Sequence, residues 1–521
     1  MVTAADQWIT TKPAVTGDGG MVAAQHIAAA RAGATMLARG GNAVDAAVAA
    51  AFALGAVEPW MCGLGGSGFM VVWLAREKRA IALDFQGVLP AELDRTDYPI
   101  DSTLPATSMG FPAVRDFANT QGARAVTVPG AVAGFDHALR SFGRKSLADA
   151  LVPAIELAEG GIPASWFCTL MIASEMDILA KDPVAASIYL PGGAPLLPGA
   201  TMKIPNLART LRRLAETGAE GFYRGDLGRD LVRELRAQGS RMTRDDLAAY
   251  RVMEHEPMRA THRGAIIHTP GEQSGGPRQR DFLAHVAAEL PEPPPVPTPG
   301  SWRIYAEALE RAWHAHRARN GTLAEVGSST SSLSAADADG NMVAVTYTLL
   351  DHFGAGITLP ETGLALNNGV SYFDPRPGLR TSMQGGKRIN SSNMVPTVAV
   401  RDGKAIFAIG ASGGDLIMPC VSQIAALMLD FGMSLEQAFH SPRIDASHRG
   451  SLRANPRLGQ AVLDELARHH SLEISGNVVM PKLYACPSGV AREGDVMVGM
   501  NDPCLPDGGA AGVRRSAKGA L

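Results

Sequence analysis

Apolar positions near the N-terminus recur with helical spacing and then give way to a continuous apolar run. The stretches 26–37 and 43–57 are rich in alanine with helical periodicity, and Asn42 stands where a helix cap is expected. Residues 69–74 (FMVVWL) form a short uninterrupted apolar run, which predicts a buried strand. The pattern therefore predicts two helices, a glycine-rich turn at 63–68 and a strand.

The middle of the chain, residues 132–250, has a mainly helical pattern, with helices predicted at 147–159 and 207–217. Residues 291–299 (PEPPPVPTP) hold six prolines in nine positions. Such a segment predicts a stiff, extended connector on the surface. A further helix is expected near 301–318.

The C-terminal half alternates strand patterns with polar turns. Residues 333–336 and 342–349 flank the sequence DADGN at 337–341, and Asp-Gly between β-prone runs predicts a hairpin. Later elements are predicted as strands at 397–401 and 405–409 and an apolar helix at 416–429. The whole chain therefore predicts an α+β fold in which helices pack on sheets.

Composition and charge exclude several classes of protein. The 521 residues include 48 Lys+Arg and 51 Asp+Glu, for a net charge of -3, so a nucleic acid partner is not expected. The N-terminal residues lack a signal-peptide pattern and no apolar run is long enough to cross a membrane, so a cytoplasmic protein is expected. Five widely spaced cysteines predict neither disulfides nor a zinc site: Cys62, Cys168, Cys420, Cys486 and Cys504.

Two other patterns argue against cofactors. Gly63, Gly65 and Gly68 satisfy G-x-G-x-x-G, but a dinucleotide site needs a strand before the motif and a helix after it, and the order is reversed here. Tight backbone packing is the alternative interpretation. The histidines lack the spacing with acidic residues that a zinc-binding helix uses, so no metal and no cofactor is expected.

The sequence GASGG at 410–414 satisfies G-x-S-x-G between a predicted strand and a predicted helix. This is the context of a nucleophile elbow, so Ser412 is a candidate nucleophile of a serine esterase. In the alternative interpretation, Gly413 and Gly414 offer backbone N–H groups to an oxyanion. The acid and histidine partners that an esterase needs would come from Asp430, Asp445, His440 and His448, although the gaps between acid and histidine are short.

A cluster of hydroxyl residues precedes the predicted hairpin. Every residue at 327–332 is Gly, Ser or Thr, and the cluster includes Thr330. A hydroxyl-rich surface loop is one interpretation. A threonine with a free α-amino group is also a self-contained nucleophile and base, because the amine has a pKa of about 7.7–8.0. That chemistry requires cleavage of the chain before the threonine.

Long blocks of the sequence resemble the γ-glutamyltransferase family. The blocks lie in order along nearly the whole chain, at 20–70, 128–139, 337–357, 363–368, 396–400 and 409–414. The resemblance implies an N-terminal-nucleophile hydrolase with a four-layer αββα sandwich. It also implies a proenzyme that cuts itself into a large and a small subunit and so frees a catalytic threonine.

The resemblance assigns the reacting groups to particular residues. Thr330 matches the catalytic threonine, so cleavage after Ser329 would give subunits 1–329 and 330–521. Thr348 matches the second threonine, which holds the hydroxyl of the nucleophile. Gly413 and Gly414 match the oxyanion hole. Ser332 stands where the family usually has histidine, so Ser329 and Ser331 remain alternative positions for the nucleophile, and a non-catalytic relative that never cleaves itself remains open.

The groups that bind a glutamate head in this family are replaced here. Gln86 follows Asp84 and Phe85 where the family has a carboxylate-binding arginine. The positions of the ammonium ligands hold Leu350, Gly369 and Tyr372, none of which supplies a carboxylate. The substrate is therefore not expected to carry an α-amino acid head.

A hydroxyl pair and two cations are retained. Ser391 and Ser392 resemble the family's Ser-Ser-Met motif, and Lys387 and Arg388 lie just upstream. Together with Gln86 and Tyr372 these are the candidate substrate-binding groups. The combination resembles the oxamate amidohydrolase branch, which implies hydrolysis of a small acid amide.

Two further questions stay open at this point. A γ-glutamyltransferase or glutathione hydrolase that uses other substrate ligands is the alternative activity. The expected assembly is an α/β heterodimer formed by self-cleavage, and a dimer of such heterodimers is a second option.

Overall fold

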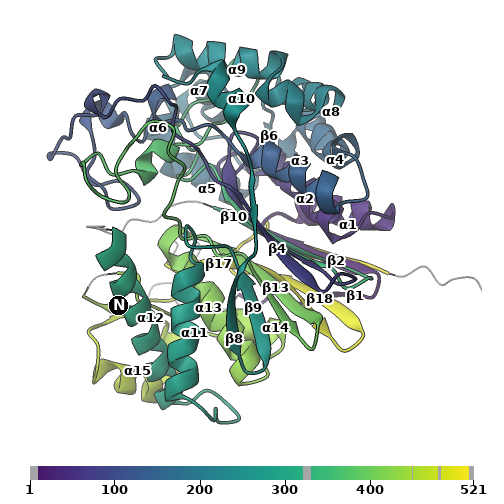
Figure 1. The fold of residues 1–521 in the computed structure, drawn as a ribbon, viewed down its shortest axis with the longest axis vertical. Helices are drawn as coiled ribbons and strands as arrows, with labels where there is room; N and C mark the ends of the chain where they lie inside the picture. The colour runs from purple at the N-terminus through teal and green to yellow at the C-terminus, as the bar shows by residue number, and fades with distance from the viewer. Residues whose placement is uncertain (1–9, 321–329, 449, 479–482, 515–521) are drawn as a thin grey trace, which may run out of the picture.

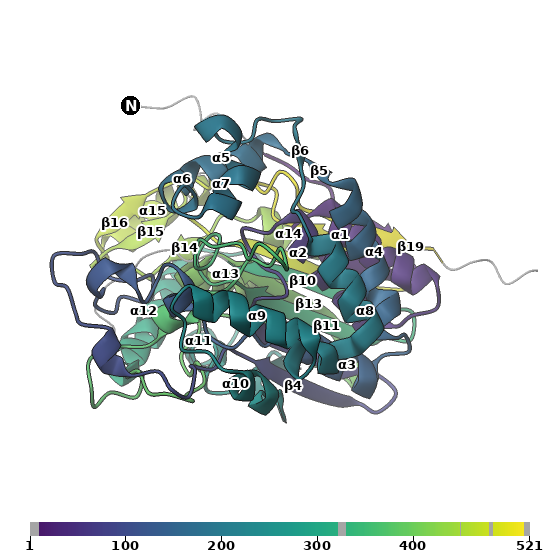
Figure 2. The same ribbon diagram turned by 90° about the horizontal axis from the view of Figure 1, so that it is seen from above.

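Two seven-stranded sheets are stacked face to face and covered by helices on both outer sides (Figure 1). The computed structural model describes residues 10–320, 330–448, 450–478 and 483–514. The layers run helix, sheet, sheet, helix, so the predicted αββα sandwich is confirmed. Seen from above, α8 and α9 lie over the strands of the sandwich (Figure 2).

The first sheet has β10, Ser331–Asp337, at its centre, between β2 and β11. Its order is β19-β2-β10-β11-β3-β4-β7, and all of its neighbours pair antiparallel. The bounds of the other strands are Gly509–Val513 for β19, Gly20–Ala24 for β2, Met342–Thr348 for β11, Ser67–Leu74 for β3, Arg79–Phe85 for β4 and Met253–His255 for β7. The predicted hairpin is therefore β10 and β11, joined by the turn at 338–341.

The second sheet has β13, Lys404–Ser412, at its centre, in the order β1-β18-β17-β13-β12-β9-β8. Its other strands are Val15–Gly17 for β1, Val496–Asn501 for β18, Cys486–Glu493 for β17, Thr397–Arg401 for β12, Ala265–Thr269 for β9 and Met258–His262 for β8. Two minor sheets lie outside the sandwich, formed by β5 (Ile162–Pro163) with β6 (Thr201–Met202), and by β14 (Ile444–Asp445), β15 (Leu452–Ala454) and β16 (Leu472–Ile474).

Alanine-rich helices cover the first sheet because small side chains let them approach it closely. α2, Ala43–Val57, is buried along nearly its whole length and contacts α1, Ile27–Ala38, together with β10 and β11. Asn42 caps α2 in a reciprocal capping box with Asp45. The other helices before β7 are α3 Ala131–Phe142, α4 Leu147–Gly160, α5 Trp166–Ser174, α6 Met176–Leu179, α7 Pro183–Tyr189, α8 Leu207–Tyr223, α9 Asp226–Ala237 and α10 Arg244–Ala249.

The second sheet is covered by α11, Gly276–Glu289, α12, Pro299–Asn320, and α13, Ile417–Asp430. Two short helices complete this layer, α14 Leu435–His440 and α15 Gln460–Ala467. α12 takes in the last proline of the predicted connector, because a proline fits the first turn of a helix. In Figure 1 these helices lie on the opposite side of the strands from α1–α4.

The predicted elements agree with the structure apart from their ends. The strand predicted at 405–409 extends to Ser412, and the helix predicted at 416–429 is preceded by a 3-10 turn at Gly414–Leu416. All five cysteines are free thiols. Among the residues described, no helix combines the length and apolar character needed to cross a bilayer.

Candidate active site

Two threonines lie at one edge of the first sheet. Thr330 directly precedes β10, and Thr348 is the last residue of β11. Because Ser331 pairs with Tyr347 in the antiparallel register, the start of β10 and the end of β11 lie side by side. Both threonines are buried. The hydroxyl of Thr348 accepts a hydrogen bond from the Leu350 N–H at 2.7 Å, which fixes its orientation at this edge.

The glycine pair lies at the matching edge of the second sheet. A Cβ on Gly410 would lie 2.4 Å from the Ser332 hydroxyl, so β10 and β13 cross there in close contact. Farther along these strands, Ala336 and Ala344 belong to one buried cluster with Ala408. Thr330, just before the start of β10, therefore lies level with the end of β13, which Gly413 follows.

Positive φ angles explain why two glycines end β13. Gly413 has φ 134° and Gly414 has φ 58°, conformations that favour glycine. A Cβ on Gly413 would also lie only 3.0 Å from the Ala485 Cα. The chain thus turns sharply at the edge that carries the two threonines, which brings two backbone N–H groups to the same end of the sandwich.

Alternation along β10 distinguishes the neighbouring hydroxyls. Ser331 donates to the Glu58 carboxylate at 3.4 Å, on the side of the first helix layer. Ser332 donates to the Val345 carbonyl at 3.2 Å and contacts Gly410 on the side of the second sheet. Since side chains alternate along a strand, Thr330 shares the face of Ser332, toward the second sheet. Ser329, the predicted residue before the cleavage, lies outside the described residues.

A catalytic triad around Ser412 is not assembled. Its buried hydroxyl has no hydrogen-bond partner among the described residues, and the strained φ belongs to Gly413 rather than to Ser412. The candidate acids are engaged elsewhere, since Asp430 accepts from His262 at 2.7 Å and Asp445 accepts from Ser447 at 2.6 Å. The candidate His440 accepts from the backbone N–H of Lys12.

Gln86 lies beside the threonine edge, directly after β4. Ser67, which pairs with Thr348, donates to the Gln86 side-chain oxygen at 3.5 Å. The Gln86 backbone N–H donates to Asp84 at 2.9 Å. The side chain is fully buried, and its amide nitrogen has no partner among the described residues. An unpaired N–H donor therefore stands where the family resemblance expects an arginine.

Arg388 is bound by the protein itself. Its guanidinium donates to the Gln86 carbonyl at 2.9 Å, to the Tyr250 hydroxyl at 3.2 Å and to the Arg251 carbonyl. The Asp84 carboxylate lies 3.6 Å away. Burial raises the pKa of Asp84, and the Arg388 charge opposes that rise. The donors of this predicted substrate ligand are thus turned toward Tyr250 and its neighbours.

The positions that the family resemblance assigns to ammonium ligands either lie in an apolar cluster or leave no room for a side chain. Leu350 and Tyr372 belong to one buried cluster with Leu89, Phe111 and Ile389. At Gly369, a Cβ would lie 2.3 Å from the Thr127 hydroxyl, so no longer side chain fits.

Ser391 and Ser392 lie beside a group of residues that sequence reasoning missed. The buried Ser391 hydroxyl has no partner among the described residues, whereas the Ser392 hydroxyl accepts from the Met394 N–H at 3.3 Å. Arg278 donates to the Ser392 carbonyl at 2.8 Å and to the Asn393 side chain at 2.7 Å. Asn393 in turn donates to Asp415, next to the glycine pair. Nothing in the sequence around Arg278 indicates this contact.

The N-terminal glycine motif acts in packing, as its context predicts. α2 precedes it and β3 follows it. A Cβ on Gly65 would lie 2.3 Å from the Ala365 carbonyl oxygen, and one on Gly68 would lie 2.4 Å from that of Thr346. Gly65 thus lets the loop before β3 approach the segment 365–366, and Gly68 lets β3 approach β11 closely. Within the described ranges, no group of three or more His, Cys, Asp or Glu residues could hold a metal ion.

Comparison with known proteins gives the family. The sequence profile of the family described as Gamma-glutamyltranspeptidase matches residues 29–321 and 304–512. The chain is 34% identical over 512 residues to the Acylase ACY 1 proenzyme of Pseudomonas sp. (strain SE83), covering 91% of this chain and 90% of that one. It is 30% identical over 481 residues to the Glutathione hydrolase proenzyme of Escherichia coli (strain K12), covering 81% and 80%.

The fold is shared with a solved acylase. The cephalosporin acylase from Bacillus halodurans superimposes with a TM-score of 0.85 over 99% of both chains, at 24% identity. The family match extends over nearly all of the sheets and helices that form the site. The chain therefore belongs to the Gamma-glutamyltranspeptidase family and is a hydrolase of amide C–N bonds with the N-terminal-nucleophile fold.

Proposed function

We propose that this protein is a self-processing amidohydrolase that uses Thr330 as its nucleophile. The observation that carries the proposal is the placement of Thr330 at the start of the central strand β10, buried beside Thr348 and on the face toward the glycine pair. The Ser331 and Ser332 hydroxyls both donate inside the core, which supports Thr330 and not a neighbouring serine as the nucleophile.

Self-processing begins with attack of the Thr330 hydroxyl oxygen on the Ser329 carbonyl carbon. The C–N bond between the two residues breaks as the C–O bond forms, and the nitrogen takes up a proton to become the α-amine of Thr330. Water then hydrolyses the ester, which gives the carboxylate of subunit 1–329 and the free hydroxyl of subunit 330–521. The new amine is available as a general base near neutral pH.

In turnover the same hydroxyl attacks the carbonyl of the substrate amide while the Thr330 amine accepts its proton. Backbone N–H groups of Gly413 and Gly414 stabilise the oxyanion, a contribution of about 2.7–4 kcal/mol for one such donor in other hydrolases. The protonated amine then delivers this proton to the leaving nitrogen. Water, activated by the same amine, then hydrolyses the acyl-enzyme ester. No step requires a cofactor.

The acyl group is expected to lack an ammonium head, because Leu350 and Tyr372 line an apolar cluster and Gly369 is closed by Thr127. A small acid amide fits this description, and oxamate is the first substrate to test. The chain is more identical to an acylase proenzyme (34%) than to a glutathione hydrolase proenzyme (30%). This difference also favours an amide other than a γ-glutamyl amide. A γ-glutamyl amide is the second candidate, since a glutathione hydrolase is among the relatives.

The proposed assembly is a heterodimer of 1–329 and 330–521 in the cytoplasm, acting on a small molecule without nucleic acid or membrane. A dimer of such heterodimers would be seen by light scattering.

The test is the intact mass of purified protein under denaturing conditions. The 54.6 kDa chain should give two species of about 34 and 20 kDa, the smaller beginning at Thr330. Thr330→Ala should leave one uncleaved chain, whereas the matched Ser331→Ala should still be cleaved. Uncleaved wild-type protein, or cleavage that persists in Thr330→Ala, would refute the proposal.

A further inference from the structure

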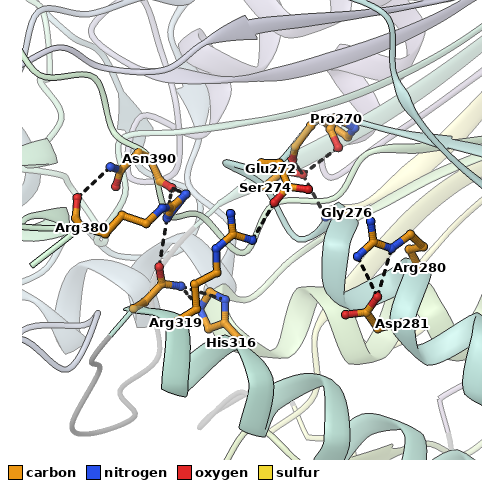
Figure 3. Close-up of polar contacts among 12 residues, drawn as sticks. Pro270, Glu272, Ser274, Gly276, Arg280, Asp281, His316, Arg319, Arg380 and Asn390 are labelled. Carbon is orange, nitrogen blue, oxygen red and sulfur yellow. Dashed lines mark hydrogen bonds and ion pairs between the residues drawn. The ribbon is translucent and has the colours of Figure 1, made fainter.

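A cavity of about 90 Å³ lies between the first turn of α11 and the C-terminal end of α12. By the same measure a single water needs only about 10–15 Å³, so the space admits a phosphate-sized anion together with water. Figure 3 shows the side chains of His316, Arg319 and Arg380 at this end of α12, and all three line the cavity. The cavity lies in the helix layer outside the second sheet, whereas Thr330 directly precedes β10 of the first sheet. It is therefore separate from the reacting threonine.

Positive charges outnumber negative charges on the wall of this cavity. The lining includes four arginines and two carboxylates: Arg278, Arg280, Arg319, Arg380, Glu272 and Asp281. Each carboxylate is already paired, Glu272 with Arg319 at 2.6 Å and Asp281 with Arg280 at 2.9 Å. Neither of the other two arginines makes an ion pair with a carboxylate in the described part of the chain. The wall thus carries an excess of two positive charges.

Arg278 is buried with one of its donors unused. The residue is 3% exposed, and its Nε–H has no hydrogen-bond partner among the described residues. Its guanidinium lies over the Trp313 ring, 4.6 Å from the ring centre. The terminal nitrogens donate to two neutral oxygens, the Ser392 carbonyl at 2.8 Å and the Asn393 side chain at 2.7 Å. The guanidinium is therefore held in place, with one N–H left to donate to a ligand.

The charge of Arg278 is only partly compensated inside the protein. Burial lowers its pKa to about 10, and the charge of Asp415 opposes that effect. Asp415 is linked to Arg278 through Asn393, which accepts from the arginine and donates to the carboxylate. A buried cation is costly unless an anion compensates it. An anion in the cavity would meet the guanidinium directly.

Two further donors belong to the same wall. Ser391 is 3% exposed, and its hydroxyl has no partner among the described residues. Arg380 donates to the Asn390 carbonyl at 2.8 Å and to the Asn320 side chain at 3.0 Å, and these bonds hold it at the cavity. The available donors thus come from α11, from the Arg380 segment and from Ser391. Such an arrangement suits an anion whose oxygens point in several directions.

We infer that this cavity binds a small tetrahedral oxyanion of the phosphate or sulfate class, held by Arg278, Arg380 and the Ser391 hydroxyl. A tetrahedral oxyanion offers an oxygen to each of the three donors, whereas a carboxylate has two oxygens in one plane. The bound anion compensates the two unpaired charges and links α11 to the segment 380–391. It therefore stabilises the packing of this segment against α11 and α12. The inference goes beyond the proposed function, and neither depends on the other.

Titration calorimetry of the purified protein with sodium phosphate at constant ionic strength tests this inference. We expect one saturable site, and a midpoint of thermal unfolding that rises with phosphate but not with sodium chloride of equal ionic strength. Sulfate should bind about as tightly as phosphate, and acetate about 10-fold more weakly because it meets fewer donors. Arg380→Met should weaken phosphate binding about 30-fold, as expected for the loss of one charge-assisted hydrogen bond.

Two other variants separate specific contacts from general charge. Ser391→Ala keeps the charge of the protein and should weaken phosphate binding about fivefold. Arg311→Met loses the same charge as Arg380→Met, but Arg311 is exposed on α12 outside the cavity lining, so this control should bind phosphate as the wild type does.

Three results would overturn the inference: no saturable binding of phosphate or sulfate by the folded wild type, unchanged binding in Ser391→Ala, or equal weakening in Arg311→Met and Arg380→Met. The intact mass of the same samples reports self-cleavage separately. Its failure would refute the proposed function and leave the anion site standing.

Discussion

Arg388 and Arg278 both lie over aromatic rings, but their guanidinium groups have different surroundings. Arg388 lies 5.1 Å from the centre of the Tyr250 ring, donates to three oxygens and lies close to the Asp84 carboxylate. Arg278 donates to two neutral oxygens, keeps an unpaired Nε–H and lacks an ion pair among the described residues.

This difference indicates that Arg388 has a structural role, whereas Arg278 can bind another group. The charge of Arg388 is compensated before any ligand arrives, so it holds β4 and the segment after it in place. Arg278 makes no ion pair among the described residues, and burial lowers its pKa to about 10 although the nearby Asp415 charge opposes that effect. Sequence position favoured Arg388 as the carboxylate ligand, because it is next to a retained motif. The hydrogen-bond partners favour Arg278 as the ligand of an anion.

The largest effect expected from this comparison is on stability. Arg388→Met leaves the buried Asp84 without its cation and should lower the free energy of unfolding by about 3–5 kcal/mol. Arg278→Met removes a buried cation that has no ion pair, so lost hydrogen bonds and relieved desolvation should nearly offset each other, for a net loss of about 1 kcal/mol. Urea unfolding measures the loss in each variant. Equal losses would show that the two arginines do not differ in their contribution to stability.

A smaller effect is expected from Tyr250, which supports only one of the two arginines. Tyr250→Phe removes the hydroxyl that donates to the Gln86 carbonyl and accepts from Arg388, and should cost about 1–2 kcal/mol. Tyr484→Phe is the control, since its hydroxyl donates to the Ser475 carbonyl away from both arginines. A loss in Tyr250→Phe no larger than that in Tyr484→Phe would show that the hydrogen bond to Arg388 does not stabilise the fold.

The contrast between the arginines also shows how far the sequence predicts this site. The predicted helices, the hairpin of β10 and β11, and the turn at Gly413 all depend on local patterns, and the structure places them as expected. Thr330, Thr348 and the glycine pair stand at the ends of those elements. Their meeting at one edge therefore follows once the two sheets are stacked.

The surroundings of Arg278 and Arg380 could not be predicted in the same way. Arg278 and Arg380 are about a hundred residues apart, and arginines are common on protein surfaces. What distinguishes these two is the absence of an ion-pair partner among the described residues, together with burial in the case of Arg278. Both properties depend on tertiary packing and leave no local pattern in the sequence. Gly369 is similar, because only the structure shows that Thr127 occupies the space of a side chain.

The burial of His316 among arginines should also appear in the pH dependence of stability. Burial, and then the nearby arginines, lower the pKa of His316 well below its ordinary value of 6.5. Below pH 6.5 the unfolded chain therefore takes up a proton that the folded chain does not, and this difference destabilises the fold as the pH falls. The charged groups facing or near His316 are Arg278, Arg317, Arg319 and Arg380, with Glu272 and Asp281 on the cavity wall.

His316→Gln should remove this contribution, which amounts to about 1 kcal/mol between pH 6.5 and 5.5. Unfolding of the two proteins in urea at several pH values isolates the difference from that of the other histidines. Parallel pH profiles for wild type and His316→Gln would show that the folded protein does not lower the pKa of His316.

The smallest predicted effect converts a paired arginine into an unpaired one. Arg319 lines the cavity between α11 and α12 but is bound to Glu272, so it resembles Arg388 more than Arg278. Glu272→Gln removes the paired carboxylate and keeps the shape of the side chain. Because the pair is about half exposed, solvent screens it, and the free energy of unfolding in urea should fall by only about 0.5 kcal/mol. The matched Asp281→Asn removes the carboxylate beside Arg280, in a pair that is equally exposed, and should cost no more. A loss from Glu272→Gln as large as that from Arg388→Met would show that exposure does not separate the two ion pairs.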